Sequence, residues 1–201
     1  MKPKKWLPGL PMPFYFLFLP WLLAFSLALG RSMAQHPQPS EPSIKIGQPV
    51  PDVSFSRVLH HPAGTARLSD FRGKLVLIDF WATWCGSCKL ALPKLDAIQQ
   101  EFGDKVQVLL VNSQSTGDTE AKIEKYFDRW RRPDGSRYPL AAAVNDTTLN
   151  ALFPHQLIPH IVWIAPNGTL HAVTGADELT PEKVRAALKG NRRHTRNHDK
   201  P

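Results

Sequence analysis

The sequence predicts an α/β domain in which a mixed β-sheet carries helices on both faces, because strand-like and helix-like patterns alternate along it. Residues 75–80 and 106–111 are short apolar runs rich in Val, Ile and Leu, typical of buried strands. Apolar residues at helical spacing follow each run, and a Pro-Asn-Gly turn at residues 166–168 separates two later strand-like segments. We therefore expect a strand, a helix, a second strand, a helix, a hairpin and a last helix.

The first half of this pattern holds two strands and two helices. The run LVLIDF at residues 75–80 is apolar except for Asp79, which fits a central strand. Helical spacing predicts a helix that begins near Cys85 and ends at Gly103. Residues 106–111 form the second strand. The next helix begins near Asp118 or Thr119, and its apolar face consists of Ile123, Tyr126, Phe127 and Trp130.

The second half holds shorter elements with clear boundary residues. Asp146 is suited to cap a short helix, and Thr180 is suited to cap the last one, with Pro181 as its first residue. The predicted elements are a short helix at residues 147–153, hairpin strands at 161–164 and 170–174, and a last helix that ends at about Leu188.

The two ends of the chain differ in composition from its middle. Three lysines precede an apolar run at residues 14–29, and small residues follow it, a pattern typical of a signal peptide cleaved before Gln35. An uncleaved membrane anchor over residues 10–29 is the alternative, because the extended run just reaches spanning length. We expect a signal peptide or anchor at 1–34, a Pro/Ser-rich linker at 35–45, a domain at 46–189 and a basic disordered tail at 190–201.

The formal net charge of +8 is confined to these ends. Four charges precede residue 35, and a net four lie from Lys189 onward, which leaves the residues between them formally neutral. A neutral domain without a basic stripe argues against nucleic-acid binding.

The only two cysteines lie in the stretch WATWCGSCK, as Cys85 and Cys88. A chain of 201 residues buries an ordinary core without a covalent staple. A bridge between these two cysteines would close only a very short loop, and loop-closure stabilisation shrinks with loop size. The pair is therefore better explained as a reactive site than as a structural disulfide.

Several features around this pair together resemble the thioredoxin fold. WCGSCK lies at a strand-to-helix turn, Asp79 precedes the first cysteine by six residues, and Ile158-Pro159 precedes the late hairpin. Segments PDVSF at 51–55 and LSDFRGK at 68–74 are similar to those of exported TlpA-like or ResA-like thiol–disulfide oxidoreductases. The resemblance covers about residues 46–188. It implies a thioredoxin-like fold with an N-terminal strand or hairpin extension, and an enzyme whose only redox group is the Cys85–Cys88 disulfide, without another cofactor.

The positions of the cysteines assign their roles. Disulfide exchange needs a thiolate of low pKa and a second thiol that resolves the mixed disulfide. Cys85 lies at the amino end of the predicted helix, where free N–H groups and the helix dipole favour negative charge. Cys88 lies one turn further in, so we expect Cys85 to be the nucleophile and Cys88 the resolving cysteine.

Asp79 and Pro159 are the other expected catalytic residues. A carboxylate in an apolar strand is unfavourable unless it has a use or a partner, and burial raises its pKa. The resemblance implies that Asp79 exchanges a proton with Cys88. It also implies that Pro159 is a cis-proline beside the disulfide.

The expected substrate-binding residues surround the cysteines. Trp84 is expected at the exposed rim, while Trp81 packs inside. By resemblance, the backbone of Ile158 pairs with an extended substrate, and Gly175 leaves room for its main chain. The remaining expected contacts are Gly86, Ser87 and His160. Ser87 stands where a proline is common and brings a hydroxyl donor to Cys85, and the His160 imidazole is expected to approach the sulfurs.

Two other functions use the same fold. Cys85, Cys88 and His160 would make a soft site for Cu(I), as in exported copper chaperones, although those usually separate their cysteines by three residues. Thiol peroxidases of this fold need a threonine three residues before the reactive cysteine and a proline seven before it. This chain has Ala82 and Ile78 at those positions.

The resulting prediction is an exported oxidoreductase that reduces disulfides of extracytoplasmic proteins. An apolar residue before the cis-proline, here Ile158, is similar to that of reducing members. Exported compartments oxidise thiols, so a reductase there needs a membrane thiol carrier as its electron donor. The expected partners are therefore exported protein thiols and disulfides and this carrier.

Overall fold

The computed structural model describes residues 44–198. The predicted signal peptide, the alternative anchor at residues 10–29 and most of the linker lie outside these residues. Within the described range, no helix combines the length and the apolar character needed to cross a bilayer.

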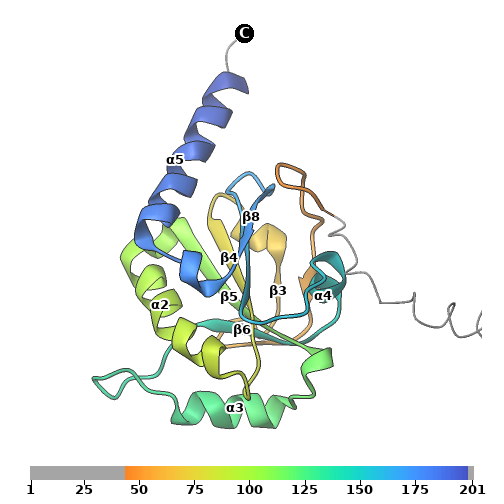
Figure 1. The fold of residues 1–201 in the computed structure, drawn as a ribbon, viewed down its shortest axis with the longest axis vertical. Helices are drawn as coiled ribbons and strands as arrows, with labels where there is room; N and C mark the ends of the chain where they lie inside the picture. Colours follow the sequence, from red (N-terminus) through yellow and green to blue (C-terminus); the bar gives the residue numbers. More distant parts are fainter. Residues whose placement is uncertain (1–43, 199–201) are drawn as a thin grey trace, which may run out of the picture. The chain divides into compact units, whose positions relative to one another are not determined.

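A six-stranded mixed sheet forms the centre of the domain, as the sequence predicts (Figure 1). Its strand order is β2-β6-β5-β4-β7-β8. β4 pairs in parallel with β5 and antiparallel with β7, so it has neighbours on both sides and all six of its residues are buried. The strands are β2 (Val58–Leu59), β4 (Leu75–Phe80), β5 (Val106–Ser113), β6 (Ala141–Asp146), β7 (His160–Ile164) and β8 (Leu170–Thr174).

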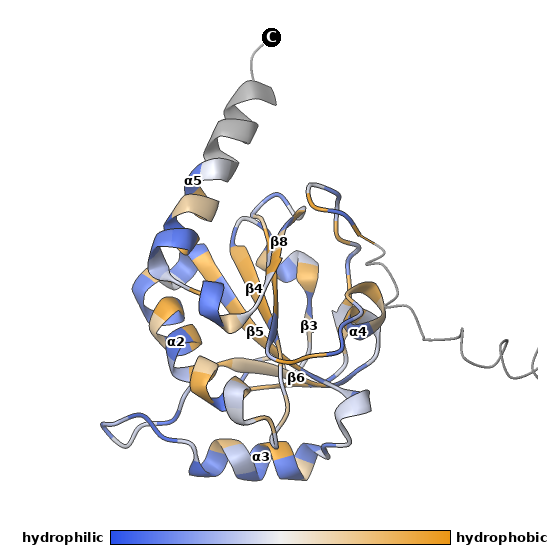
Figure 2. Cartoon of the chain, viewed as in Figure 1, coloured by the Kyte–Doolittle hydropathy of each residue, from blue (hydrophilic) through white to orange (hydrophobic). Residues whose placement is uncertain are grey.

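Helices cover both faces of this sheet, and the strands alternate between two apolar cores. Leu75 and Leu77 of β4 pack in the core that also contains residues of α2, α3 and α5, whereas Val76 and Ile78 pack in the core that contains residues of α4. The apolar character of the strands between more hydrophilic helices is visible in Figure 2. The helices are α2 (Gly86–Phe102), α3 (Glu120–Arg129), α4 (Thr148–Leu152) and α5 (Pro181–His198).

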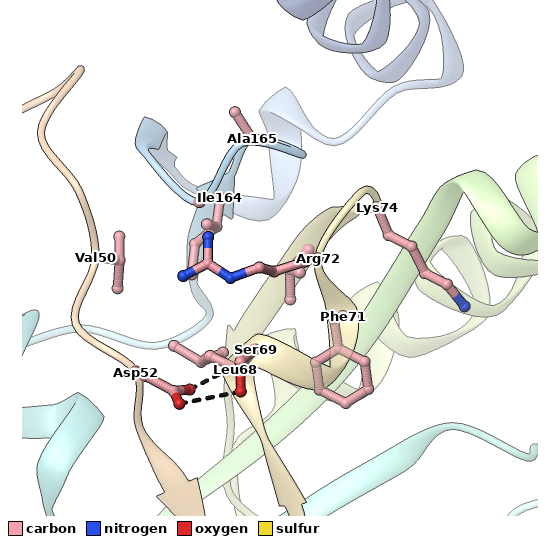
Figure 3. Close-up of a pocket in the computed structure, with 11 residues that line it drawn as sticks. Val50, Asp52, Leu68, Ser69, Phe71, Arg72, Lys74, Ile164 and Ala165 are labelled. Atoms are coloured by element: carbon pink, nitrogen blue, oxygen red, sulfur yellow. Dashed lines mark hydrogen bonds between the residues drawn. The ribbon is translucent and has the colours of Figure 1, made fainter.

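An N-terminal extension packs on the face that carries α4. β1 (Ser54–Phe55) pairs antiparallel with β3 (Ala66–Arg67) in a separate small sheet, and a 3-10 turn at Leu68–Phe71 follows. The Asp52 carboxylate accepts hydrogen bonds from the Ser69 N–H (2.9 Å) and hydroxyl (3.0 Å) beside a small pocket of about 30 Å³ (Figure 3). These bonds fix the extension that the resemblance implies.

Side chains at the helix starts accept hydrogen bonds from the first turns. Thr119 accepts from the Lys122 N–H and caps α3, and Thr180, a predicted cap, accepts from the Lys183 N–H of α5. Asp146 accepts from the N–H groups of Leu149 and Asn150, as expected for the cap of α4. The elements predicted from residue 75 onward are therefore present, with boundaries within a few residues except at the end of α5.

Three elements differ from the prediction. Strands β2 (Val58–Leu59) and β6 (Ala141–Asp146) were not predicted. β2 has only two residues, and β6 opens with three alanines, a residue type depleted in strands. We expected the last helix to end at about Leu188 and a disordered tail from residue 190, but α5 continues to His198. We had placed the end of the helix where its apolar face ends in the sequence, and the helix continues beyond that point.

Candidate active site

The two cysteines lie where β4 passes into α2. Cys85 is the N-cap residue of α2 and Cys88 lies in its first turn. They form a disulfide with Cα atoms 5.3 Å apart. Cys85 keeps 5% of its surface exposed and Cys88 keeps none. Of the two sulfur-bearing residues, Cys85 is the one with access to solvent.

Two donors point at the Cys85 sulfur. The Cys88 N–H donates to it at 3.2 Å, and the Ser87 hydroxyl lies 3.5 Å away. A disulfide sulfur carries no proton, so the hydroxyl is the donor in this state. The same two donors and the amino end of α2 would favour negative charge on this sulfur after reduction.

The loop before β7 contacts the disulfide. The Ile158–Pro159 peptide bond is cis, as the resemblance implies. The Ile158 carbonyl oxygen lies 3.7 Å from the Cys85 sulfur, and its side chain packs against both cores. This carbonyl and the exposed edge of Cys85 therefore occupy the same small region of the surface.

Asp79 is a buried carboxyl without a partner. It has no exposed surface, and neither carboxyl oxygen has a hydrogen-bond partner in the structure. Its neighbours across the sheet are Leu110 of β5 and Ile161 of β7, which both pack in the core that contains Cys85 and Cys88. Burial raises the pKa of the Asp79 carboxyl well above its usual range. Asp79 thus lies on the same face of the sheet as the disulfide, in an environment that favours its protonated form.

The two tryptophans of the motif separate as predicted. Trp81 is 1% exposed and packs in the core, whereas Trp84 is 60% exposed. The Trp84 indole N–H donates to the Thr116 carbonyl at 3.0 Å. A groove of about 320 Å³ adjoins Trp84, Thr116, His155 and Ile158. The rim of the site therefore has a fixed aromatic wall on the side of β5.

The two glycines differ in their surroundings. A Cβ atom at Gly86 would meet no atom within 4 Å. A Cβ atom at Gly175 would lie 2.6 Å from an Asp177 carboxylate oxygen, so a side chain at this position would clash with Asp177. Gly175 follows Thr174, which pairs with Ile161 on β7, and so lies at the sheet edge where the cis-proline loop ends.

His160 does not approach the sulfurs, and this part of the prediction is wrong. Its partner in the sheet is Phe80, and both rings lie on the α4 side, opposite the core of the disulfide. The His160 ring stacks on His155 with centroids 4.5 Å apart. Burial, with a contribution from His155, lowers the pKa of His160 to about 4. Among the side chains of residues 44–190, no cluster of three or more His, Cys, Asp or Glu is suited to hold a metal ion.

Sequence reasoning missed a buried polar network beneath the motif. Thr83 donates two hydrogen bonds to Asp118, through its N–H and its hydroxyl, and Asn112 donates a third. From the sequence, Asp118 was expected only near the start of a helix. A polar Asn112 at the end of an apolar strand was the available signal, since a buried amide needs partners.

A redox-active disulfide at a helix amino end, beside a buried carboxyl and a cis-proline, defines a thiol–disulfide oxidoreductase of the thioredoxin fold. The family comparison agrees. The chain belongs to the AhpC/TSA family, whose model matches residues 46–171, and within it to the ResA-like and TlpA-like redoxins.

Curated relatives and a solved structure support this class. The chain is 32% identical over 127 residues to thioredoxin-like protein YneN of Bacillus subtilis, covering 63% of this chain and 67% of the relative. It is 30% identical over 171 residues to thiol–disulfide oxidoreductase ResA of Geobacillus thermodenitrificans, covering 83% and 90%. The exposed lipoprotein thioredoxin of Streptococcus pneumoniae superposes with a TM-score of 0.56 at 26% identity, covering 68% of this chain and 99% of that structure.

Proposed function

We propose that this oxidoreductase is exported and reduces disulfides in extracytoplasmic proteins, with Cys85 as nucleophile and Cys88 as resolving cysteine. The observation that carries the role assignment is the difference between the two sulfurs. The Cys85 sulfur has two donors and Cys85 keeps 5% of its surface exposed, whereas Cys88 keeps none. Attack on a protein disulfide needs both access and a stabilised thiolate, and only Cys85 combines them.

The reduction proceeds in two exchange steps. The Cys85 thiolate attacks one sulfur of the substrate disulfide, the substrate S–S bond breaks, and the released substrate thiolate takes a proton. The Cys88 thiolate then attacks the Cys85 sulfur, which releases the second substrate thiol and leaves the Cys85–Cys88 disulfide. Two electrons pass to the substrate, and a membrane dithiol carrier returns them by the same exchange, becoming a disulfide itself.

In its ionised form, Asp79 accepts the Cys88 proton, directly or through water, before the second step. A base for this proton is needed because burial disfavours the ionised form of a thiol. Because the pKa of Asp79 is raised, it is closer to the pKa of a thiol. Proton exchange between the carboxyl and the Cys88 thiol is therefore easier. The Asp79 position, on the disulfide face and without another partner, supports this role.

The substrate would lie across the rim formed by Trp84 and the cis-proline loop. The Ile158 backbone is the expected partner of an extended substrate segment, beside Gly86, Ser87 and Gly175. His160 has no part in this proposal, because its ring faces the α4 side.

Export is supported by the lysine-rich and then apolar amino end of the sequence and by similarity to a lipoprotein described as exposed. Reduction is favoured over oxidation by the apolar Ile158 before the cis-proline. The two halves of the proposal are independent and need separate tests.

The direction is tested by the reduction potential of the Cys85–Cys88 pair. The purified chain is equilibrated in glutathione or dithiothreitol buffers while tryptophan fluorescence is recorded. We expect a value close to that of thioredoxin, about −270 mV. A value close to that of a strong oxidant such as DsbA, about −120 mV, would reverse the assigned direction. Export is tested by fractionation, with a mature chain that begins at Gln35 as the expected product.

A further inference from the structure

The buried network beneath the active-site loop centres on Asp118. Its side chain has no exposed surface. One carboxylate oxygen accepts from the Thr83 N–H at 2.7 Å and from the Asn112 amide at 3.0 Å. The other accepts from the Thr83 hydroxyl at 2.6 Å and pairs with the Lys122 ammonium at 2.9 Å. Thr83 stands two residues before the nucleophile, so two of these four interactions fasten the active-site loop itself.

The network continues from Asp118 to the exposed tryptophan. The Asn112 amide also donates to the Trp81 carbonyl at 3.3 Å, and its oxygen accepts from the Thr116 hydroxyl at 2.9 Å. The Thr116 carbonyl in turn accepts from the Trp84 indole at 3.0 Å. The loop at residues 81–84 is thereby fixed at three points to the end of β5 and the turn that follows it.

The carboxylate of Asp118 is suited only to accept. Burial alone would raise its pKa, but hydrogen bonds from Thr83, Lys122 and Asn112 outweigh burial and hold the pKa below its usual range. The helix cap of α3 is Thr119, so α3 does not need Asp118 as its cap. Three of the four donors to Asp118 come from Thr83 and Asn112. Thr83 is part of the active-site loop, and Asn112 donates to the Trp81 carbonyl of the same loop.

We propose that Asp118 is a positioning residue for protein substrates: it holds loop 81–84 so that the Trp84 indole forms a fixed wall of the groove beside Ile158. The groove has a volume of about 320 Å³ and lies between the Trp84–Thr116 contact and the loop that carries His155 and Ile158. A substrate that extends beyond its disulfide touches this wall, whereas a small disulfide reaches Cys85 without it. The proposal needs only disulfide exchange at Cys85, and neither export nor the reducing direction.

Asp118→Asn tests this with almost no change in shape, since it replaces one accepting oxygen with an NH₂ group that faces donors. The full chain is assayed with insulin as substrate and dithiothreitol as reductant, and kcat and KM are measured. The small disulfide 5,5′-dithiobis(2-nitrobenzoate) reacts with dithiothreitol directly, so it is mixed instead with reduced protein freed of dithiothreitol, and the rate constant of this single exchange is measured. We expect KM for insulin to rise about tenfold and the rate with the small disulfide to stay within about twofold. Equal losses with both substrates would overturn the proposal, because they would indicate general damage to the site.

A double-mutant cycle shows whether Asp118 acts through the tryptophan. Once Trp84→Ala has removed the wall, Asp118→Asn should raise KM for insulin by less than about twofold more. Additive effects would contradict the proposed connection. Asp128→Asn is the matched control, because this exposed carboxylate on α3 pairs with Arg137 at 3.0 Å and contacts no part of the network. Its kinetics should equal those of the wild type.

Two milder variants keep the test decisive if Asp118→Asn does not fold. Thr83→Val removes one of the two bonds to the loop and should raise KM for insulin by a smaller factor in the same direction. Lys122→Ala removes an ion pair to Asp118 but no bond to the loop, so it should raise KM for insulin by less than Thr83→Val does. The reverse order of these two effects would overturn the proposal. If the wild type does not reduce insulin, the reducing direction fails, and the same cycle is run on the oxidation of reduced insulin chains.

Discussion

Two buried aspartates near the disulfide have opposite surroundings. Asp79 lies in β4 with no partner for either oxygen, while Asp118 follows the neighbouring β5 and has four donors. Burial raises the pKa of Asp79, whereas the pKa of Asp118 is lowered because its hydrogen bonds outweigh burial. Burial by itself therefore does not decide the charge of a carboxyl group, and the available donors do.

This difference separates two uses of a buried acid. A carboxylate with all its donors satisfied is a fixed acceptor that holds the groups around it, as Asp118 holds Thr83. A carboxyl without partners destabilises the fold when ionised, and it remains free to exchange a proton with a neighbouring thiol. We infer that Asp79 serves the chemistry and Asp118 serves the geometry of the same site.

The largest effect is expected at the cysteines, whose reaction both aspartates are proposed to serve. Cys85→Ser should lower turnover by at least about 1,000-fold, because it removes the nucleophile. Cys88→Ser should retain attack but trap substrates as mixed disulfides with Cys85, which are visible by non-reducing electrophoresis. Equal trapping by the two variants would contradict the assignment of roles.

The next effect separates the aspartates by reaction step. Asp79→Asn removes the proton acceptor of Cys88 and should slow the second exchange step at neutral pH by about 100-fold, the lower end of the usual contribution of a positioned acid or base. Stopped-flow tryptophan fluorescence measures this step. Asp118→Asn should leave it nearly unchanged. A similar slowing in both variants would remove the distinction.

The two aspartate substitutions should change the stability of the protein in opposite directions. Asp79→Asn removes an ionisable group whose burial disfavours its charge, so the free energy of unfolding at pH 7 should rise by about 1–3 kcal/mol. Asp118→Asn leaves buried donors unsatisfied, and the same quantity should fall by about 1–3 kcal/mol. Urea unfolding at fixed redox state measures both. The pKa of Asp79 is raised in the folded state, so its penalty to the free energy of unfolding shrinks as the pH falls. The pKa of Asp118 is lowered in the folded state, so its stabilising contribution is lost as the pH falls below 3.8.

The smallest effect on activity is expected at His160 on the other face of the sheet, whose titration should change only the stability and so serves as a check on these pH arguments. Its pKa falls from 6.5 to about 4 on folding, so the unfolded chain binds more protons between these values. The free energy of unfolding should therefore fall as pH decreases from 6.5 to 4, by at most roughly 1.4 kcal/mol per pH unit. His160→Gln should flatten this slope. An unchanged slope would show that the ring titrates normally.

The residues near one another in sequence were the ones that could be predicted. The spacing of Asp79, Cys85 and Cys88 around one strand-to-helix turn fixes their approximate placement, and Pro159 was found by resemblance. Thr83 and Asp118 are 35 residues apart and meet only because β4 and β5 pair in parallel, which no local pattern reveals. The predicted position of the His160 ring was wrong because β7 is apolar on both faces, so the sequence does not show which residues of that strand face α2.

The most direct test of the comparison is an NMR titration of the two carboxyl groups. The oxidised protein is labelled with ¹³C at the aspartate carboxyls, and the signals are assigned with Asp79→Asn and Asp118→Asn. We expect Asp79 to titrate well above 3.8 and Asp118 below it. A titration of Asp79 at or below 3.8 would show that it is ionised and stabilised at neutral pH, and would contradict its role as the proton-exchanging group.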